Sequence, residues 1–148
     1  MRKYITVIFI LCLLTTSPGK AIALPAVPLD IITQKETLHF TVEVAATAAE
    51  QEYGFMYRET VPDGHGMIFV FTPPQPVDMW MEHTPASLDM LFIDAHGIIT
   101  KIAPRAMPES TDIIHSDGDV SFVLEVAGGT AERSHIAKGD KVLYPVPQ

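Results

Sequence analysis

The residues best suited to hold a small polar ligand lie around Trp80, the only tryptophan of the chain. Glu82 follows it closely, and Asp89 comes after the segment 84–87. If that segment is a four-residue turn between two strands, the two carboxylates face each other on the side that carries the indole. Like charges so placed are destabilising unless a cation or a ligand lies between them. An aromatic ring beside two carboxylates also suits a saccharide, which offers an apolar face and hydroxyl protons.

Two arginines could complete this ligand-binding site. Arg58 is expected at the end of a helix, and Arg105 lies in a polar segment. Arg58 has a second interpretation, because Glu125 interrupts an apolar strand and could form a buried ion pair with it. The first interpretation predicts ligand binding by Trp80, Glu82, Asp89, Arg58 and Arg105. The competing interpretation places the indole in the core and leaves the acids solvated, and a one-residue slip of register would exchange the two faces of the hairpin.

The opposite face of the same hypothetical hairpin carries soft metal ligands, namely Met79, Met81, His83 and Met90. Thioether and imidazole groups suit Cu(I) or Ag(I), and Cu(I) is the cofactor under this alternative. Methionine is also a common filler of irregular cores, so core packing is favoured. The ligand-binding interpretation expects no cofactor.

No catalytic motif of known spacing occurs in the sequence. It contains no metalloprotease helix motif, no glycine-rich phosphate loop and no serine elbow. Paired carboxylates raise glycoside hydrolysis, but the sequence gives no sign of an acid with a raised pKa. We therefore expect binding without catalysis.

The first 23 residues have the pattern of a signal peptide. Arg2 and Lys3 precede an apolar run, and Ala21-Ile22-Ala23 offers small residues for cleavage after Ala23. The apolar run is about 12 residues long, short of the roughly 20 that span a bilayer. Cys12 lacks the preceding small residues expected of a lipid-modified cysteine. The sequence predicts an exported protein, periplasmic or secreted, with no membrane span after cleavage.

The expected mature chain is acidic and free of cysteine. Removing Arg2, Lys3 and Lys20 leaves seven basic residues against all 18 acidic ones, a formal charge of −11. Such a chain repels phosphate backbones, so nucleic acid is excluded as a partner. Without cysteine the mature chain has no disulfide, thiolate metal site or cysteine nucleophile.

The hydrophobic pattern predicts a mainly β (α+β) domain over residues 36–148, after a loose N-terminal arm at 24–35. Thr47 and Glu50 form a capping box that starts a short helix to about residue 57, and Gly97 suits the turn of a hairpin. A second short helix should follow Gly129. The expected strands are 38–44, 67–71, 77–83, 88–94, 98–103, 120–126 and 141–144. Six or seven strands with two short helices predict a compact β-sandwich or a partly open barrel.

Two loops support a third interpretation, a protein-interaction or assembly module. Residues 72–76 contain three prolines, which remove amide donors from any sheet. Residues 104–118 are polar and are expected to form a long loop. Together they would make the contact surface for a protein partner.

Five motifs, in this order, resemble the family known as domain of unknown function 192. They are Gly54-Phe55-Met56-Tyr57-Arg58, then Gly66-Met67-Ile68-Phe69-Val70-Phe71, then Trp80-Met81 with Thr84, then Leu88-Asp89 with Phe92-Ile93-Asp94, and Val123-Leu124-Glu125-Val126 with Gly128. The resemblance covers about residues 40–144. It implies a compact, mainly β domain, often exported, without an established activity. Glu82 and His83 replace a usual lysine and asparagine, and Met79 a common phenylalanine, so no role of that lysine is carried over.

Overall fold

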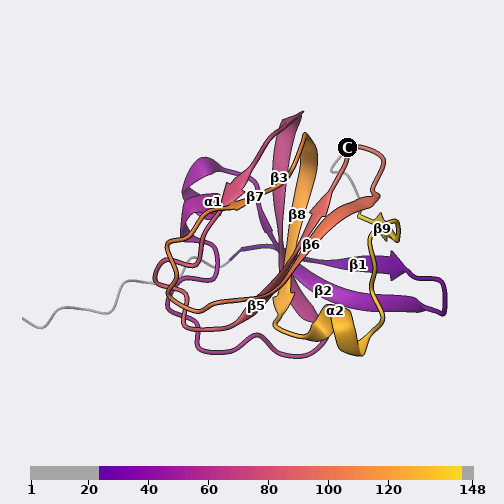
Figure 1. Ribbon diagram of the computed structural model, residues 1–148, viewed down its shortest axis with the longest axis horizontal. Coiled ribbons are helices and arrows are strands. Elements are labelled where there is room, and N and C mark those ends of the chain that lie inside the picture. The colour runs from indigo at the N-terminus through magenta and orange to yellow at the C-terminus, as the bar shows by residue number, and fades with distance from the viewer. Residues whose placement is uncertain (1–23, 145–148) are drawn as a thin grey trace, which may run out of the picture.

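The structure, a computed structural model, describes residues 24–144, so the predicted signal peptide at 1–23 lies outside the described residues. Nine strands and two helices follow one another along this range (Figure 1). They are β1 (Ala26–Ile32), β2 (Thr37–Ala45), α1 (Ala48–Tyr53), β3 (His65–Gln75), β4 (Asp78–Met79), β5 (Leu88–Ile93), β6 (Ile99–Ala106), β7 (Ile114–His115), β8 (Val120–Ala127), α2 (Thr130–Arg133) and β9 (Lys141–Leu143). Within residues 24–144, none of the helices is long and apolar enough to cross a membrane.

Seven of these strands form one curled sheet in the order β6-β5-β8-β3-β2-β1-β9. Neighbouring strands are antiparallel except for β2 and β3, which are parallel. The two ends of the sheet meet at one point, where Ile98 bridges to Lys141. The sheet is therefore a half-closed barrel, which confirms the predicted fold class. The short strands β4 and β7 form a separate pair.

The side chains of the curled sheet divide into two apolar clusters, because successive residues of a strand point to opposite faces. The inner cluster fills the barrel and includes Ile31, Val42, Ile68 and Leu124. The outer cluster lies on the other face and contains Met67, Phe69, Met81, Met90 and Val123. Figure 1 shows α1 and β7 together at the left of the view, α2 at the bottom, and β9, the last strand of the main sheet, at the right.

Several local predictions are confirmed. The Thr47 side chain accepts from the Glu50 amide while the Glu50 carboxylate accepts from the Thr47 amide, so α1 begins with a capping box. The β5–β6 hairpin forms as expected, and Gly97 has a φ of 79° in its turn. Asp94 closes that turn by accepting hydrogen bonds from the amides of His96 and Ile98.

Four predicted segments are wrong. Residues 26–32 are not a loose arm but strand β1, because Leu29 and Ile31 alternate into the barrel despite the nearby prolines. The predicted strand 77–83 shrinks to Asp78–Met79, which pairs with β7. Strand β6 extends to Ala106, and β7 interrupts the loop expected up to residue 118. Strand β3 runs into the proline-rich segment, although pairing with β8 is irregular between Val70 and Gln75.

The Asp89 side chain of β5 joins the end of β6 and the start of α2 to the sheet. Its side chain is fully buried, and its Oδ1 accepts hydrogen bonds from the amides of Arg105 and Gly129, each at 2.8 Å. Its Oδ2 accepts a third from Ala131 at 2.8 Å. Gly129, the residue before α2, offers no side-chain cap, so a carboxylate from β5 supplies the acceptor that a helix start needs.

The substitution Asp89→Asn should lower the free energy of unfolding by about 3 kcal/mol, because the amide group presents N–H donors toward the Ala131 N–H and leaves it unsatisfied. Asp94→Asn is the matched control. The two hydrogen bonds of Asp94 to described residues use only Oδ1, which asparagine retains, so the cost should stay below about 1 kcal/mol. Urea unfolding of both variants measures the difference, and equal losses would contradict this role of Asp89.

Candidate functional site

A cavity of about 330 Å³ opens on the outer face of the sheet, between α1, β3, β4 and the residues that follow β4. We call it the outer cavity. Its lining residues are Ala48, Gln51, Glu52, Tyr53, Gly54, Phe55, Met56, Phe69, Phe71, Val77, Asp78, Met79, Trp80, Glu82, Thr84 and Glu125. Its volume is in the range of small-molecule sites, and most of its wall is aromatic or aliphatic.

Helix α1 is fixed to the sheet at two points on this cavity. The Gln51 side-chain amide donates a hydrogen bond to the Val70 carbonyl oxygen at 2.7 Å. Gly54 ends the helix with a φ of 44°, and a Cβ there would lie 3.3 Å from the Phe69 ring. The helix therefore approaches the sheet closely enough for its last turn to form one wall.

The opposite wall is the segment that contains β4. The Val77 amide donates to the Ser116 hydroxyl at 3.0 Å, and the Met81 amide donates to the Ser110 carbonyl at 2.9 Å. Between these two anchors Trp80 is 40% exposed. The indole is thus a rim residue with one part in the cavity and one part in water.

Glu125 provides the carboxyl group at the base of the outer cavity. It lies on β8, in the middle of the sheet, where Met67 of β3 and Met90 of β5 are its register partners. Both methionines are fully buried, and Glu125 itself is 3% exposed. Alternation along β8 places Glu125 on the outer face with Val123, opposite to Leu124 and Val126.

The Glu125 carboxyl makes no side-chain hydrogen bond or ion pair with any residue of the described range 24–144. Burial alone raises its pKa from the ordinary 4.5 to about 8, because the charged form loses its hydration. At neutral pH the group is therefore mainly protonated. A protonated carboxyl can donate one hydrogen bond and accept others, and the Glu125 side chain lines the outer cavity.

Trp80 and Glu82 are the two predicted ligand-binding residues that line the outer cavity. Asp89 belongs to the anchor of α2 described above, and Arg105 pairs with Glu132 at 2.6 Å. Arg58 forms two hydrogen bonds with Glu43, so the expected ion pair between Arg58 and Glu125 is wrong. The sequence pointed to Glu125 because it is an acid within an apolar strand. The sequence did not show which residues surround Glu125 in the fold.

The predicted opposition of Glu82 and Asp89 is also wrong. Asp89 is opposite Val126 of β8, because β5 pairs with β6 and β8 rather than with the segment before it. The segment 84–87 is therefore not the turn of a hairpin. Glu82 is exposed at the rim, whereas Asp89 is buried.

The four predicted metal ligands lie in two places. Met81 and Met90 are buried in the outer cluster, and Met79 packs against that cluster and lines the cavity. His83 is exposed and stacks on Tyr57, with ring centroids 5.5 Å apart. Among residues 24–144, no group of three or more His, Cys, Asp or Glu side chains is placed to hold a metal ion.

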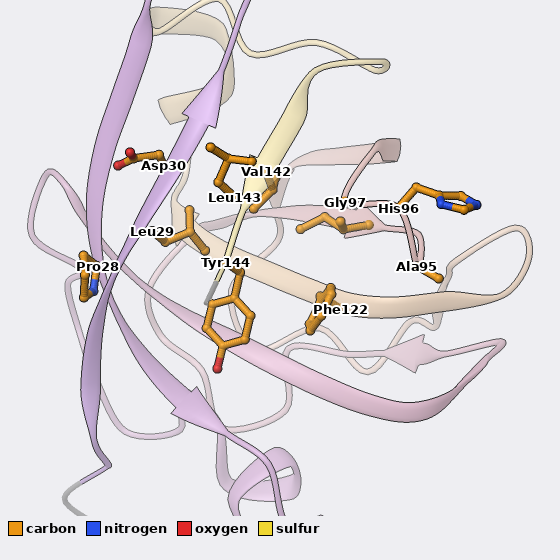
Figure 2. Close-up of a pocket in the computed structure, with 11 residues that line it drawn as sticks. Pro28, Leu29, Asp30, Ala95, His96, Gly97, Phe122, Val142, Leu143 and Tyr144 are labelled. Carbon is orange, nitrogen blue, oxygen red and sulfur yellow. The ribbon is translucent and has the colours of Figure 1, made fainter. Parts of the chain in front are cut away.

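A second cavity, of about 510 Å³, lies where β1, β9 and the β5–β6 turn meet (Figure 2). Phe122 and Tyr144 pack edge to face on it, with centroids 5.4 Å apart. Figure 2 shows the side chains of Asp30 and His96 directed away from the Tyr144 ring. Although it is larger, this cavity lacks a buried carboxyl such as Glu125, so we place the candidate site in the outer cavity.

The curled sheet and its outer cavity define a small β domain with a ligand-sized site built on one face. The chain belongs to the family called domain of unknown function 192 and described as Uncharacterized ACR, whose model matches residues 30–144. This confirms the resemblance seen in the sequence. Four of the five motifs that carry the resemblance meet at the outer cavity, to which they contribute residues such as Gly54, Phe69, Trp80, Thr84 and Glu125.

Two solved structures are similar over most of the chain. A candidate transcription regulator from Sinorhizobium meliloti 1021 is 38% identical, with a TM-score of 0.81, over 84% of this chain and 97% of that one. A protein of unknown function from Novosphingobium aromaticivorans DSM 12444 is 36% identical, with a TM-score of 0.80, over 82% and 86%. No curated protein matches this chain.

The raised pKa of Glu125 predicts a specific pH dependence of stability. Between pH 4.5 and about 8 the folded protein holds a proton that the unfolded chain releases, so stability falls as pH rises through this window. The free energy of unfolding of the wild type, relative to Glu125→Gln, should fall by a few kcal/mol across it and level off above about pH 8. Urea titrations at several pH values measure this difference, and a difference that does not change with pH would contradict the buried, unpartnered state of Glu125.

Proposed function

We propose that this protein binds a small ligand in the outer cavity and does not transform it. The observation that carries the proposal is the Glu125 carboxyl, which is buried at the base of a cavity and has no hydrogen-bond partner in the described chain. No buried side-chain nitrogen or oxygen atom of the described residues lacks a hydrogen-bond partner, so the Glu125 oxygens, which bond to none of these residues, must reach the surface of the cavity. A ligand that reaches the base of the cavity can bond to them in place of water.

The walls indicate the shape of such a ligand. Trp80, Phe69 and Phe71 present apolar surface, whereas Glu125 presents one polar group at the base. A ligand with an apolar face and a group that hydrogen-bonds is suited to this arrangement, and the saccharide predicted from the sequence is one such class. Trp80 and Glu82 remain in this proposal, while Asp89, Arg58 and Arg105 have other contacts.

Glu125 is an acid with a raised pKa, which the sequence alone did not reveal, but it is the one buried carboxyl of the described lining, so we propose binding rather than catalysis. Glu125 lies at the base, and the other carboxyl groups of the lining, on Glu52, Asp78 and Glu82, belong to exposed residues. General acid–base chemistry needs a positioned acid or base beside the reacting atoms, commonly with a second group. Because the sequence predicts a signal peptide, we also propose that binding takes place outside the cytoplasm.

Binding of Cu(I) or Ag(I) is a second candidate, favoured by the methionines of this region. Met56 and Met79 line the cavity, and Met67 and Met90 flank Glu125 in the sheet. Thioethers are suitable ligands for Cu(I). This set differs from the one predicted from the sequence, because His83 stacks on Tyr57 instead.

Titration of the intact protein with a saccharide panel and with Ag(I), followed by Trp80 fluorescence, tests the proposal. Trp80 is 40% exposed, so acrylamide should quench its emission before ligand is added and less effectively afterwards. A ligand that saturates this change should bind at least about tenfold more weakly to Glu125→Leu, which removes both the donor and the acceptor, because one buried hydrogen-bond partner is worth about 1–3 kcal/mol. Met107→Ala, at an exposed residue outside the lining, is the matched control.

The outcomes separate the candidates. A response to Ag(I) that survives Glu82→Gln but fails in the double variant Met56→Leu with Met79→Leu, the two methionines that line the cavity, moves metal binding to first place. An emission that no ligand alters, together with retention of the protein by a partner in pull-down, would replace the proposal with the protein-interaction module.

A further inference from the structure

We propose that the ligand of the outer cavity is a small organic cation, an amine or quaternary ammonium group carried on an apolar body. This inference rests on the proposed function and names the chemical class of its ligand. It is carried by three features of the cavity. They are a buried carboxyl that bonds to no residue of the range 24–144, a wall rich in aromatic rings, and a described lining that contains acids but no basic side chain.

The first feature is the missing partner of Glu125. Its neighbours in the sheet, Met67 and Met90, offer no N–H or O–H group. Two basic groups that contact lining residues have partners of their own: Arg58, which lies over the Phe55 ring, pairs with Glu43, and His115 pairs with Asp78 at 2.6 Å. A protonated amine entering the cavity would be both a hydrogen-bond donor and a counter-charge for this carboxyl, whereas a quaternary ammonium group would supply the counter-charge alone.

The second feature is the aromatic wall. Five aromatic residues line the cavity, namely Tyr53, Phe55, Phe69, Phe71 and Trp80. Aromatic faces attract cations through their quadrupole, and cages of such rings recognise quaternary ammonium groups. One ring of this wall already holds a cation of the protein, because the Arg58 guanidinium carbon lies 5.1 Å from the Phe55 centroid.

The third feature is the sign of the charge around the opening. Glu52, Asp78 and Glu82 accompany Glu125 in the lining, whereas Lys, Arg and His are absent from its described residues. A cleft lined by one sign of charge concentrates ligands of the opposite sign. An anionic ligand is disfavoured by the same field, and a neutral sugar gains little from it.

The site also couples cation binding to a proton. Burial raises the pKa of Glu125 to about 8, whereas a bound cation favours its ionised form, so binding below about pH 8 releases a proton. The other titratable groups that face the cavity are Glu52 and Tyr53 from α1, Asp78 from β4, and Glu82 after it. Strands β3 and β5 present only methionine beside Glu125.

Calorimetry on the intact protein with matched pairs of ligands tests the inference. Choline is compared with its neutral isostere 3,3-dimethylbutan-1-ol, and benzylamine with benzyl alcohol. At about pH 8.5 at least one cation should bind tenfold or more tightly than its neutral partner. At about pH 6.5 its affinity should be more than tenfold lower, because Glu125 must lose a proton of pKa about 8, and buffers of different ionisation enthalpy should report the release of nearly one proton.

Two variants separate charge recognition from loss of structure. Glu125→Gln should abolish both the preference for the cation over its neutral isostere and the pH dependence of the affinity. Circular dichroism checks that this variant is folded. Glu82→Gln, at an exposed rim residue, should weaken cation binding only a few-fold and leave proton release unchanged. If the neutral isosteres bind as tightly as the cations, or if only saccharides bind, the inference of a cationic ligand is wrong. The proposed function, binding of a small ligand in the outer cavity, would still stand. If no cation, neutral partner or saccharide binds, both proposals fall.

Discussion

The burial of one carboxyl group in the central strand of the sheet is the constraint around which the outer face is arranged. Glu125 lies on β8, which is paired on both sides, so its side chain cannot turn to solvent at an edge. An isolated charge in such surroundings is costly, and the group responds by holding its proton, with a pKa of about 8. Glu125 differs from an ordinary core residue because the cavity between α1 and β4 extends to it.

The chain buries two carboxyls on adjacent strands and surrounds them in opposite ways. Asp89 of β5 accepts hydrogen bonds from three backbone amides and thereby holds the end of β6 and the start of α2. The Glu125 carboxyl of β8 accepts none from residues 24–144, and two methionines flank it. The first arrangement stabilises a fold, whereas the second leaves a polar group available. This contrast is the physical reason for placing function at Glu125 and structure at Asp89.

The features that the sequence predicted correctly depend on local interactions. The capping box of α1, the turn at Gly97 and the alternation of β2 and β8 each involve residues a few positions apart. The failures depend on pairing between distant segments. Because β5 pairs with β8, Asp89 is opposite Val126, and no local pattern around residues 84–87 could reveal this. Strand β1 was missed because its prolines obscured the alternation of apolar residues. Its pairing with β2 and β9, which are distant parts of the sheet, was not visible in the local sequence.

The candidate site was predicted in part for the same reason. Trp80 and Glu82 drew attention by their residue types, and both line the outer cavity. Glu125 was visible as an acid within an apolar strand, but the partner assigned to it, Arg58, bonds to Glu43. Which polar group lacks a partner is a property of the complete packing, so it emerges only when every neighbour has been placed.

A direct titration of the Glu125 carboxyl tests the central claim most closely. The measurement is a carbon-13 NMR pH titration of glutamate side-chain carboxyls, with the Glu125 signal assigned by its absence from Glu125→Gln, in the free protein and with saturating choline or benzylamine. The account predicts a midpoint near the pKa of about 8 in the free protein and a lower one with bound cation. A free-protein midpoint in the ordinary range near 4.5 would show that the carboxyl is solvated or partnered, and would contradict the account.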